Sequence, residues 1–475
     1  MEAEPESQPI WPTEDNLGEG IQSPISKGLA GPLVRDVPRA DAICVAILIL
    51  ACALRFFAYY EINYEDLSRP PVMGNGDQID LFRIAHAIAH GRGFSRDDSP
   101  ELTQLFQNYQ TQEGAVPYSE SELDALSKRG LLDDQYPDRP DRTAYRDILY
   151  PYVASIFADA SDPFLALRLL NFFLVCFNAL LIFFVAKRIG VGHTLSVLCA
   201  GLYLVHPYTP LHASLLMTET LATSVIAGLV LVCLQIDDSR SLRTCVLLGV
   251  GVGLLILAKK QFLLLLPVYA LIFLAGLWRK DFTLRQGAVA AVTTLIVSLP
   301  LFINSWQVTH DLGFITGTNG WNDMPAAYSR ELARSGMSDF YKIRTASFDY
   351  YRAQTGRTIK GELETARAGK ELFHYMLRED GFVARIPRLV VLKLVNEVFP
   401  SKNLYILALI VASLAGFALT LRRYSSQLCL AILLSCMLAV ALTHGAYGRM
   451  LFSTVIVQCV GVALLLKVQL IRAGD

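Results

Sequence analysis

Residues 164–186 read FLALRLLNFFLVCFNALLIFFVA, a segment that is apolar except for Arg168 and two asparagines and that is followed directly by Lys187-Arg188. A helix of about 20 apolar residues is long enough to cross the hydrocarbon layer of a bilayer. Basic residues just beyond such a segment mark the end that faces the cytoplasm. The segment therefore predicts a membrane-spanning helix whose C-terminal end lies inside.

Apolar blocks of this kind recur along the 475 residues, of which 53% are hydrophobic and 18% charged. The sequence predicts an all-α polytopic membrane protein with about ten transmembrane helices and two large extracytoplasmic loops that carry interfacial helices. The blocks near 193 and 243 are short for a span. Besides 164–186, the predicted spans are 41–60, 193–208, 213–236, 243–258, 261–277, 285–304, 403–421, 427–443 and 450–468.

Basic residues at the ends of these blocks favour one topology, with the N-terminus inside. Residues 1–40 are then a disordered cytoplasmic tail, and 41–304 form an N-terminal transmembrane catalytic module that includes a first outer loop, 61–162. Residues 305–402 form a second large outer loop, and 403–475 the C-terminal transmembrane helices. The predicted inner basic residues are Arg35, Arg39, Lys187, Arg188, Arg240, Arg243, Arg279, Lys280, Arg285, Arg422, Arg423, Lys467 and Arg472.

Charge and cysteine content exclude several classes of protein. With 42 Lys and Arg against 43 Asp and Glu, the chain is not a strongly basic nucleic-acid binder, and no nucleic-acid partner is expected. It shows no zinc-type Cys/His spacing and no Gly-rich phosphate loop. All nine cysteines fall inside apolar segments, where they are expected to pack as small hydrophobic residues.

The first outer loop contains the first candidate for chemistry, Gly74-Asn75-Gly76-Asp77, just before a helical pattern over 79–89. Asp is a preferred residue at a helix start, so Asp77 can simply cap this helix. A carboxylate fixed beside an apolar phase can also act as a general base. Asp80, one turn later, is the alternative base.

Cations form the second candidate group. Lys259-Lys260 lies in an outer turn between two apolar blocks, against the positive-inside tendency, which favours an anionic ligand over a merely solvated turn. Arg449, beside Tyr447, lies at the outer entry of the last block. It can reach lipid headgroups or hold a phosphate through two hydrogen bonds.

Two further features belong to the outer side. Glu219 lies near the outer end of a span, where an acid is costly and serves either a functional site or a structural ion pair with a neighbouring span. Asn319 and Trp321 follow Thr318 in a loop that offers polar groups and an aromatic surface suited to a sugar ring. Such a site would take an activated sugar from the lipid phase, because the chain has no nucleotide-binding motif.

At these residues the sequence resembles the GT-C superfamily of integral-membrane glycosyltransferases, particularly the branch of protein O-mannosyltransferases and aminoarabinose-type transferases. The resemblance implies that Asp77 is the catalytic base. The cations at this site, Lys259, Lys260 and Arg449, are expected to bind the donor phosphate and to stabilise the charge that develops on it. The matching positions are Gly76-Asp77 to Leu81, Ala85, Gly91, Gly93 to Ser95, Tyr150-Pro151, His206-Pro207, Thr218-Glu219, Gly253 to Lys260, Thr318 to Gly320 and Gly448-Arg449.

The chain departs from this pattern at three places. Gln78 follows Asp77 where several relatives have a second acid, Lys259-Lys260-Gln261 stands where many have Arg-Pro, and Met450 follows the late Arg in place of an aromatic residue. The expected substrate-binding residues are Glu219, Tyr150, Asn319, Trp321 and Tyr447.

These observations predict an inverting glycosyltransferase that moves a sugar from a polyprenyl-phosphate donor to an extracytoplasmic hydroxyl of a glycolipid, polysaccharide or protein. Membrane lipid is expected to surround the helices as a further partner. A bacterial inner membrane is the expected location. No metal ligands are assigned; a divalent metal is compatible with the family but not indicated, because the first loop has no Asp-x-Asp around Asp77. The alternatives are a transporter or flippase for a lipid-linked or anionic solute, and a non-catalytic scaffold.

Overall fold

The computed structural model describes residues 39–64, 76–97, 143–144, 146–216, 218–314, 317–328, 340–359, 361–379, 381–393, 404–442 and 451–474, with residues 99 and 102. These residues form helices and no β-strand. Residues 1–38 of the predicted tail lie outside the described residues, as does most of 98–142 in the first predicted loop.

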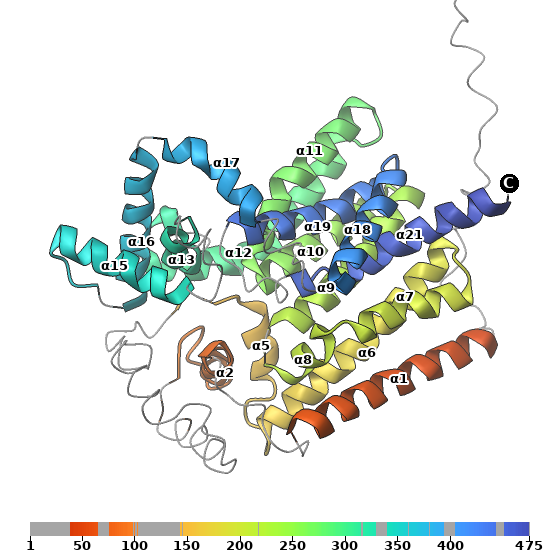
Figure 1. Ribbon diagram of the computed structural model, residues 1–475, viewed down its shortest axis with the longest axis horizontal. Coiled ribbons are helices and arrows are strands. Elements are labelled where there is room, and N and C mark those ends of the chain that lie inside the picture. Colours follow the sequence, from red (N-terminus) through yellow and green to blue (C-terminus); the bar gives the residue numbers. More distant parts are fainter. Residues whose placement is uncertain are drawn as a thin grey trace, which may run out of the picture.

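The helices follow one another in chain order (Figure 1). Their bounds are α1 Arg39–Tyr64, α2 Gly76–Ala89, α5 Leu149–Ser155, α6 Pro163–Ile189, α7 His193–Val205, α8 Tyr208–Ser214, α9 Thr218–Asp238, α10 Leu242–Ala258, η4 Lys260–Leu264, α11 Leu265–Trp278, α12 Leu284–Thr309, η5 Leu312–Phe314, α13 Asn319–Ala327, α15 Phe340–Thr355, α16 Gly361–Arg378, α17 Phe382–Lys393, α18 Leu404–Leu419, α19 Tyr424–Leu442 and α21 Val455–Gly474.

Ten apolar helices occupy the ten predicted blocks. Six of them are long and apolar enough to cross a membrane: Arg39–Ala58, Pro163–Ile189, Thr218–Asp238, Lys260–Trp278, Leu284–Thr309 and Val455–Arg472. Four are shorter: His193–Val205, Leu242–Ala258, Leu404–Leu419 and Tyr424–Ala439. The prediction of an all-α polytopic membrane protein is confirmed.

Local sequence explains where the central span, α6, begins and ends. The Asp162 side chain accepts a hydrogen bond from the Leu165 N–H at 2.9 Å, and Pro163 occupies the first turn, where its missing N–H is harmless. Gly190 ends the helix with φ 92°, a left-handed conformation that glycine adopts without strain. Between these signals α6 runs for 27 residues.

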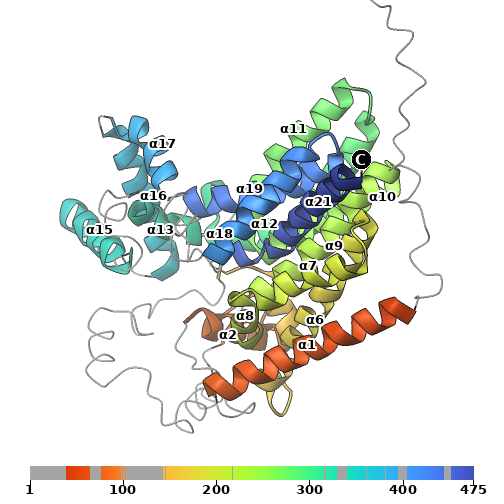
Figure 2. The ribbon, with the colours of Figure 1, turned by 45° about the vertical axis from the view of Figure 1, so that its right-hand side comes forward.

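The segments predicted to lie inside are joined at one end of the molecule. Lys187 at the end of α6 binds Asp41 of α1, and Lys467 of α21 donates to the Gly190 carbonyl at 3.2 Å. Arg240, between α9 and α10, pairs with Asp281, between α11 and α12, at 3.0 Å. The C-terminal end of α21 and the start of α1 lie on the right in Figures 1 and 2.

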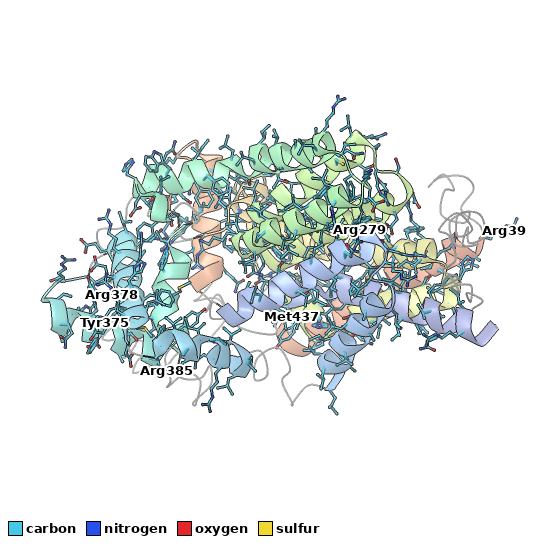
Figure 3. All side chains as sticks on the ribbon, turned by 90° about the horizontal axis from the view of Figure 1, so that it is seen from above. Arg39, Arg279, Tyr375, Arg378, Arg385 and Met437 are labelled. Atoms are coloured by element: carbon cyan, nitrogen blue, oxygen red, sulfur yellow. The ribbon has the colours of Figure 1, made fainter. Side chains whose placement is uncertain are left out.

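The polar loops lie at the opposite end. Helices α2 and α5 lie side by side at this end, and α13, α15 and α16 lie further to the left in Figure 1. Figure 3 shows Tyr375 and Arg378 of α16 and Arg385 of α17 far from Arg39 of α1. The predicted amphipathic helices of the second loop correspond to α15, α16 and α17.

Candidate functional site

Residues 143–147, called here the 143–147 segment, join the described parts of both outer loops to the membrane helices. The Ala144 carbonyl accepts hydrogen bonds from the Thr318 N–H and from the Lys260 ammonium, each at 3.4 Å. The Asn304 side chain of α12 donates to the Thr143 carbonyl at 2.8 Å. The segment therefore contacts both α12 and the turn that contains Lys259 and Lys260.

Glu362 of α16 anchors the second outer loop to this segment. Its Oε1 accepts hydrogen bonds from the Ala144 N–H at 3.0 Å and the Thr318 hydroxyl at 2.6 Å, and its Oε2 accepts one from the Thr143 hydroxyl at 2.7 Å. Arg96 lies 3.7 Å from Oε2, and the carboxylate side chain is only 4% exposed. A buried carboxylate needs such a set of donors, so Glu362 is a structural anchor of the site.

The first turns of α2 contact the other side of the segment. Asp80 pairs with Arg146 at 2.7 Å and with Arg96 at 3.6 Å. Asp80, predicted as the alternative base, is therefore held between two guanidinium groups, which suits an anchor.

Gln78 connects the same part of α2 to Leu216, just before α9. Its side-chain Oε1 accepts the Leu216 N–H at 3.0 Å, and the residue is fully buried. Asp77 belongs to the first turn of α2, one residue before Gln78, but its side chain lies outside the described residues. The backbone of Asp77 is thus tied closely to the residues that precede Glu219.

Glu219 and Lys259 form a buried ion pair. The Lys259 ammonium lies 3.1 Å from Glu219 Oε1, and the two side chains are 5% and 0% exposed. Lys259 is extended at the end of α10, and its N–H closes the helix on the Leu255 carbonyl. Each charge compensates the other in a region where either alone would be very unfavourable.

Lys260 lies between this pair and the 143–147 segment. Its N–H donates to Asp147 Oδ1 at 3.1 Å. Burial raises the pKa of the Asp147 carboxyl above its ordinary value, although the positive charges of Lys260 and Lys259 offset part of this effect. Two carboxyl groups and two ammonium groups therefore influence one another at the start of α9 and the end of α10.

Gly317 allows the second loop to approach this group. It has φ +100°, and a Cβ there would lie 2.4 Å from the Ala144 carbonyl oxygen and 2.8 Å from the Lys260 ammonium nitrogen. Only a residue without a side chain fits both the conformation and the space. This glycine brings Thr318 to the segment.

The other predicted residues are placed differently. Tyr150 is buried in α5 and packs in an apolar cluster with Leu81 and Phe82 of α2. Trp321 of α13 donates its indole N–H to the Gly313 carbonyl at 3.1 Å and so belongs to the α13–α16 contact, apart from the charged group. The side chain of Asn319, and all of Tyr447 and Arg449, lie outside the described residues.

Several residues of the site do not follow from the sequence pattern. Arg96, Arg146, Asp147 and Glu362 lie in polar stretches where charged residues are common, and no spacing marks them. They become important because chain segments more than a hundred residues apart meet, for example Asp147 and Lys260, 113 residues apart. A hint existed in Arg146-Asp147, which lies just before the Tyr150-Pro151 motif.

Comparisons of sequence with known proteins found no match, either among protein-family models or among curated proteins. Comparison of structures did find similar proteins. One is the archaeal oligosaccharyltransferase AglB from Archaeoglobus fulgidus, in complex with an inhibitory peptide and a dolichol-phosphate, at 14% sequence identity and a TM-score of 0.49. The match covers 90% of this chain and 51% of AglB, so the chain spans about half the length of that protein.

A second similar structure is ArnT from Cupriavidus metallidurans bound to undecaprenyl phosphate. It has 13% sequence identity and a TM-score of 0.38, and the match covers 88% of this chain and 77% of ArnT. Both matched proteins belong to the GT-C superfamily that the sequence motifs of this chain resemble.

Proposed function

We propose that this protein is an integral-membrane glycosyltransferase that moves a sugar from a polyprenyl phosphate to a hydroxyl on the extracytoplasmic side. One observation carries the proposal. Lys260, in the turn between two apolar helices, lies among the 143–147 segment, Asp147 and the Glu219–Lys259 pair, where both polar loops meet. Cations kept at this end of the spans suit an anionic headgroup that arrives from the bilayer.

Lys260 is the stronger candidate for binding the donor phosphate. Lys259 lies in the buried pair with Glu219 at 3.1 Å, whereas the Lys260 ammonium lies 3.4 Å from the Ala144 carbonyl, beside Gly317 of the second loop. If a phosphate oxygen replaced the Ala144 carbonyl oxygen as acceptor, the hydrogen bond from the Lys260 ammonium would become stronger, because the new acceptor is charged. Arg449 is the proposed second phosphate ligand.

The proposed reaction is a single displacement. The acceptor hydroxyl attacks the anomeric carbon, Asp77 accepts the hydroxyl proton, and the bond from the anomeric carbon to the phosphate oxygen breaks with inversion. The lipid phosphate leaves as an anion and needs no acid, unlike the leaving group of an ordinary glycoside. Charge develops on that phosphate, where each cation contributes on the order of 3 kcal/mol if water is excluded.

The proposed location is a bacterial inner membrane, with the site facing outward. The acceptor is an extracytoplasmic hydroxyl, and the second outer loop, which contributes Glu362 and Thr318 to the site, is the proposed wall on the acceptor side.

Substitution at Asp77 tests the proposal directly. Membranes that contain the protein are supplied with a radiolabelled polyprenyl-phosphate sugar and an extract of envelope acceptors. Asp77→Asn is expected to lower covalent transfer by about 100-fold or more, because the amide cannot accept the proton. Asp349→Asn is the matched control, since Asp349 is exposed on α15 and pairs only locally with Arg352.

Three outcomes distinguish the alternatives. Full transfer by Asp77→Asn would remove Asp77 as the base. Movement of the labelled lipid between leaflets without covalent transfer would indicate a flippase. Lys260→Ala is expected to weaken use of the donor, whereas Lys260→Arg retains part of it because the positive charge remains.

A further inference from the structure

A cluster of metal-ligating side chains lies away from the charged site, where the end of α2 meets the turn between α5 and α6. His86 and His90 are one helical turn apart on α2, and Asp159 belongs to that turn. One ligand atom from each of the three residues lies within 4.8 Å of those of the other two. His90 Nε2 is 3.6 Å from Asp159 Oδ1.

Both imidazole rings are oriented by an oxygen acceptor at the same ring nitrogen. His86 Nδ1 bonds to the carboxylate of Asp97, which is fully buried and also binds Arg92. His90 Nδ1 bonds to the His86 carbonyl at 2.9 Å. A neutral imidazole with its proton at Nδ1 presents a lone pair at Nε2, and a carboxylate or carbonyl behind a histidine is the usual support of a metal ligand.

We propose that His86, His90 and Asp159 bind one divalent transition-metal ion of the zinc type. Two imidazole nitrogens and one carboxylate oxygen suit zinc better than magnesium or calcium, which prefer oxygen ligands alone. A water molecule completes a tetrahedral set. The site is open to the ion, because the side chains of His90 and Asp159 are 44% and 69% exposed.

Small side-chain rotations would form the coordination bonds. Zinc needs its ligands at about 2.0 to 2.2 Å, which places ligand atoms roughly 3 to 3.5 Å apart. The His90–Asp159 distance of 3.6 Å is already near this range, and the three ligand atoms lie within 4.8 Å of one another. Binding would join the C-terminal end of α2 to the turn that leads into α6. The sequence alone does not give this site, because Asp159 lies far along the chain from the His86-x-x-x-His90 pair.

This proposal is independent of the proposed glycosyl transfer and is tested by metal binding. The full-length protein is purified in detergent, treated with EDTA and titrated with zinc chloride against a chromogenic chelator. One zinc ion per chain and a higher melting temperature with zinc are expected, since a ligand of the native state stabilises it. Magnesium chloride is expected to have no effect on either readout.

His90→Ala is the informative variant because His90 is partly exposed and its loss leaves the apolar packing of α2 in place. It is expected to weaken zinc binding about tenfold or more, while its melting temperature without zinc stays that of the wild type. Asp97→Asn is expected to weaken binding without removing a ligand. His374→Ala, at an exposed histidine of α16, is the matched control and is expected to change nothing.

Two results would overturn the assignment. One is a wild-type protein that binds no zinc at micromolar concentrations. The other is a His86→Ala, His90→Ala double variant that retains the full stoichiometry and affinity, which would place the ion elsewhere.

Discussion

The adjacent residues Lys259 and Lys260 have different surroundings, because Lys259 forms a buried ion pair with Glu219. The pair places two formal charges in a buried region at the start of α9 and the end of α10, where each charge offsets part of the cost of burying the other. Lys259 then supports the local structure, and Lys260 is the lysine proposed to meet the donor. From the sequence the two lysines look equivalent; the burial of one and the contacts of the other distinguish them.

Loss of one member of this pair is expected to destabilise the protein strongly. Glu219→Gln removes the carboxylate that lies 3.1 Å from the buried Lys259 ammonium, and about 3 to 5 kcal/mol of stability is expected to be lost. The double variant Glu219→Gln, Lys259→Met removes both charges and is expected to recover most of that loss. Reversible unfolding in mixed micelles measures the three free energies.

An exposed pair provides the control for this prediction. Arg352 and Asp349 lie 3.0 Å apart with side chains 51% and 60% exposed, so Asp349→Asn is expected to change stability by less than about 1 kcal/mol. If Glu219→Gln lowered the free energy of unfolding by no more than this, the buried Lys259 ammonium would have found another acceptor.

At the scale of elements, α18 and α21 approach so closely that only glycine fits between them. A Cβ on Gly461 would lie 2.7 Å from Cβ of Ser413, and one on Gly416 would lie 1.8 Å from the Gly461 carbonyl oxygen. Small residues at such crossings let helix backbones pack closely inside a membrane. This contact fixes the last described helix against the C-terminal half of the bundle.

Gly461→Ala is expected to force α18 and α21 apart and to lower stability by about 1 to 3 kcal/mol. The melting temperature in detergent reports this change. Gly201→Ala is the matched control, because Gly201 lies inside α7 and a Cβ there would meet no atom within 4 Å. Equal melting temperatures for the two variants would show that the helices adjust without loss.

The whole molecule has two chemically different ends. The segments with basic residues are tied together at one end, and the charged site and the polar helices lie at the other. The positive-inside tendency predicts that the first end faces the cytoplasm. Both outer loops then face the same compartment as the proposed acceptor.

Cysteine labelling tests this orientation. Ala346 of α15 and Ser239, between α9 and α10, are exposed at opposite ends, whereas the native cysteines are buried or half-buried in apolar helices. In spheroplasts, a membrane-impermeant maleimide is expected to label Ala346→Cys at once and Ser239→Cys only after the membrane is permeabilised. Labelling in the reverse order would invert the topology.

The spans could be predicted from sequence because the physics is local. A run of apolar residues long enough to cross the bilayer, with basic residues beyond one end, needs no knowledge of distant contacts. Thus 164–186 predicts α6, Pro163–Ile189, to within a few residues. The short blocks at 193 and 243 also correspond to helices, α7 and α10.

The site could be predicted only in part. Lys259, Lys260 and Glu219 stand out because charge is rare in apolar surroundings, and the structure brings them together with Asp80 through the 143–147 segment. Glu362 could not be found this way, since a glutamate at the start of an amphipathic helix is ordinary. Its importance comes from three donors that only the folded chain assembles.

The bond between Thr143 and Glu362 has a consequence for biogenesis, because 219 residues separate the two partners. When Thr143 leaves the translocon, the ribosome has not yet made α16, so the first exterior loop cannot reach its final form. Its contact with α16 can form only after six more apolar helices have been made, namely α6, α7, α9, α10, α11 and α12. Assembly of the proposed site is therefore expected to be a late event, absent from truncated translation products.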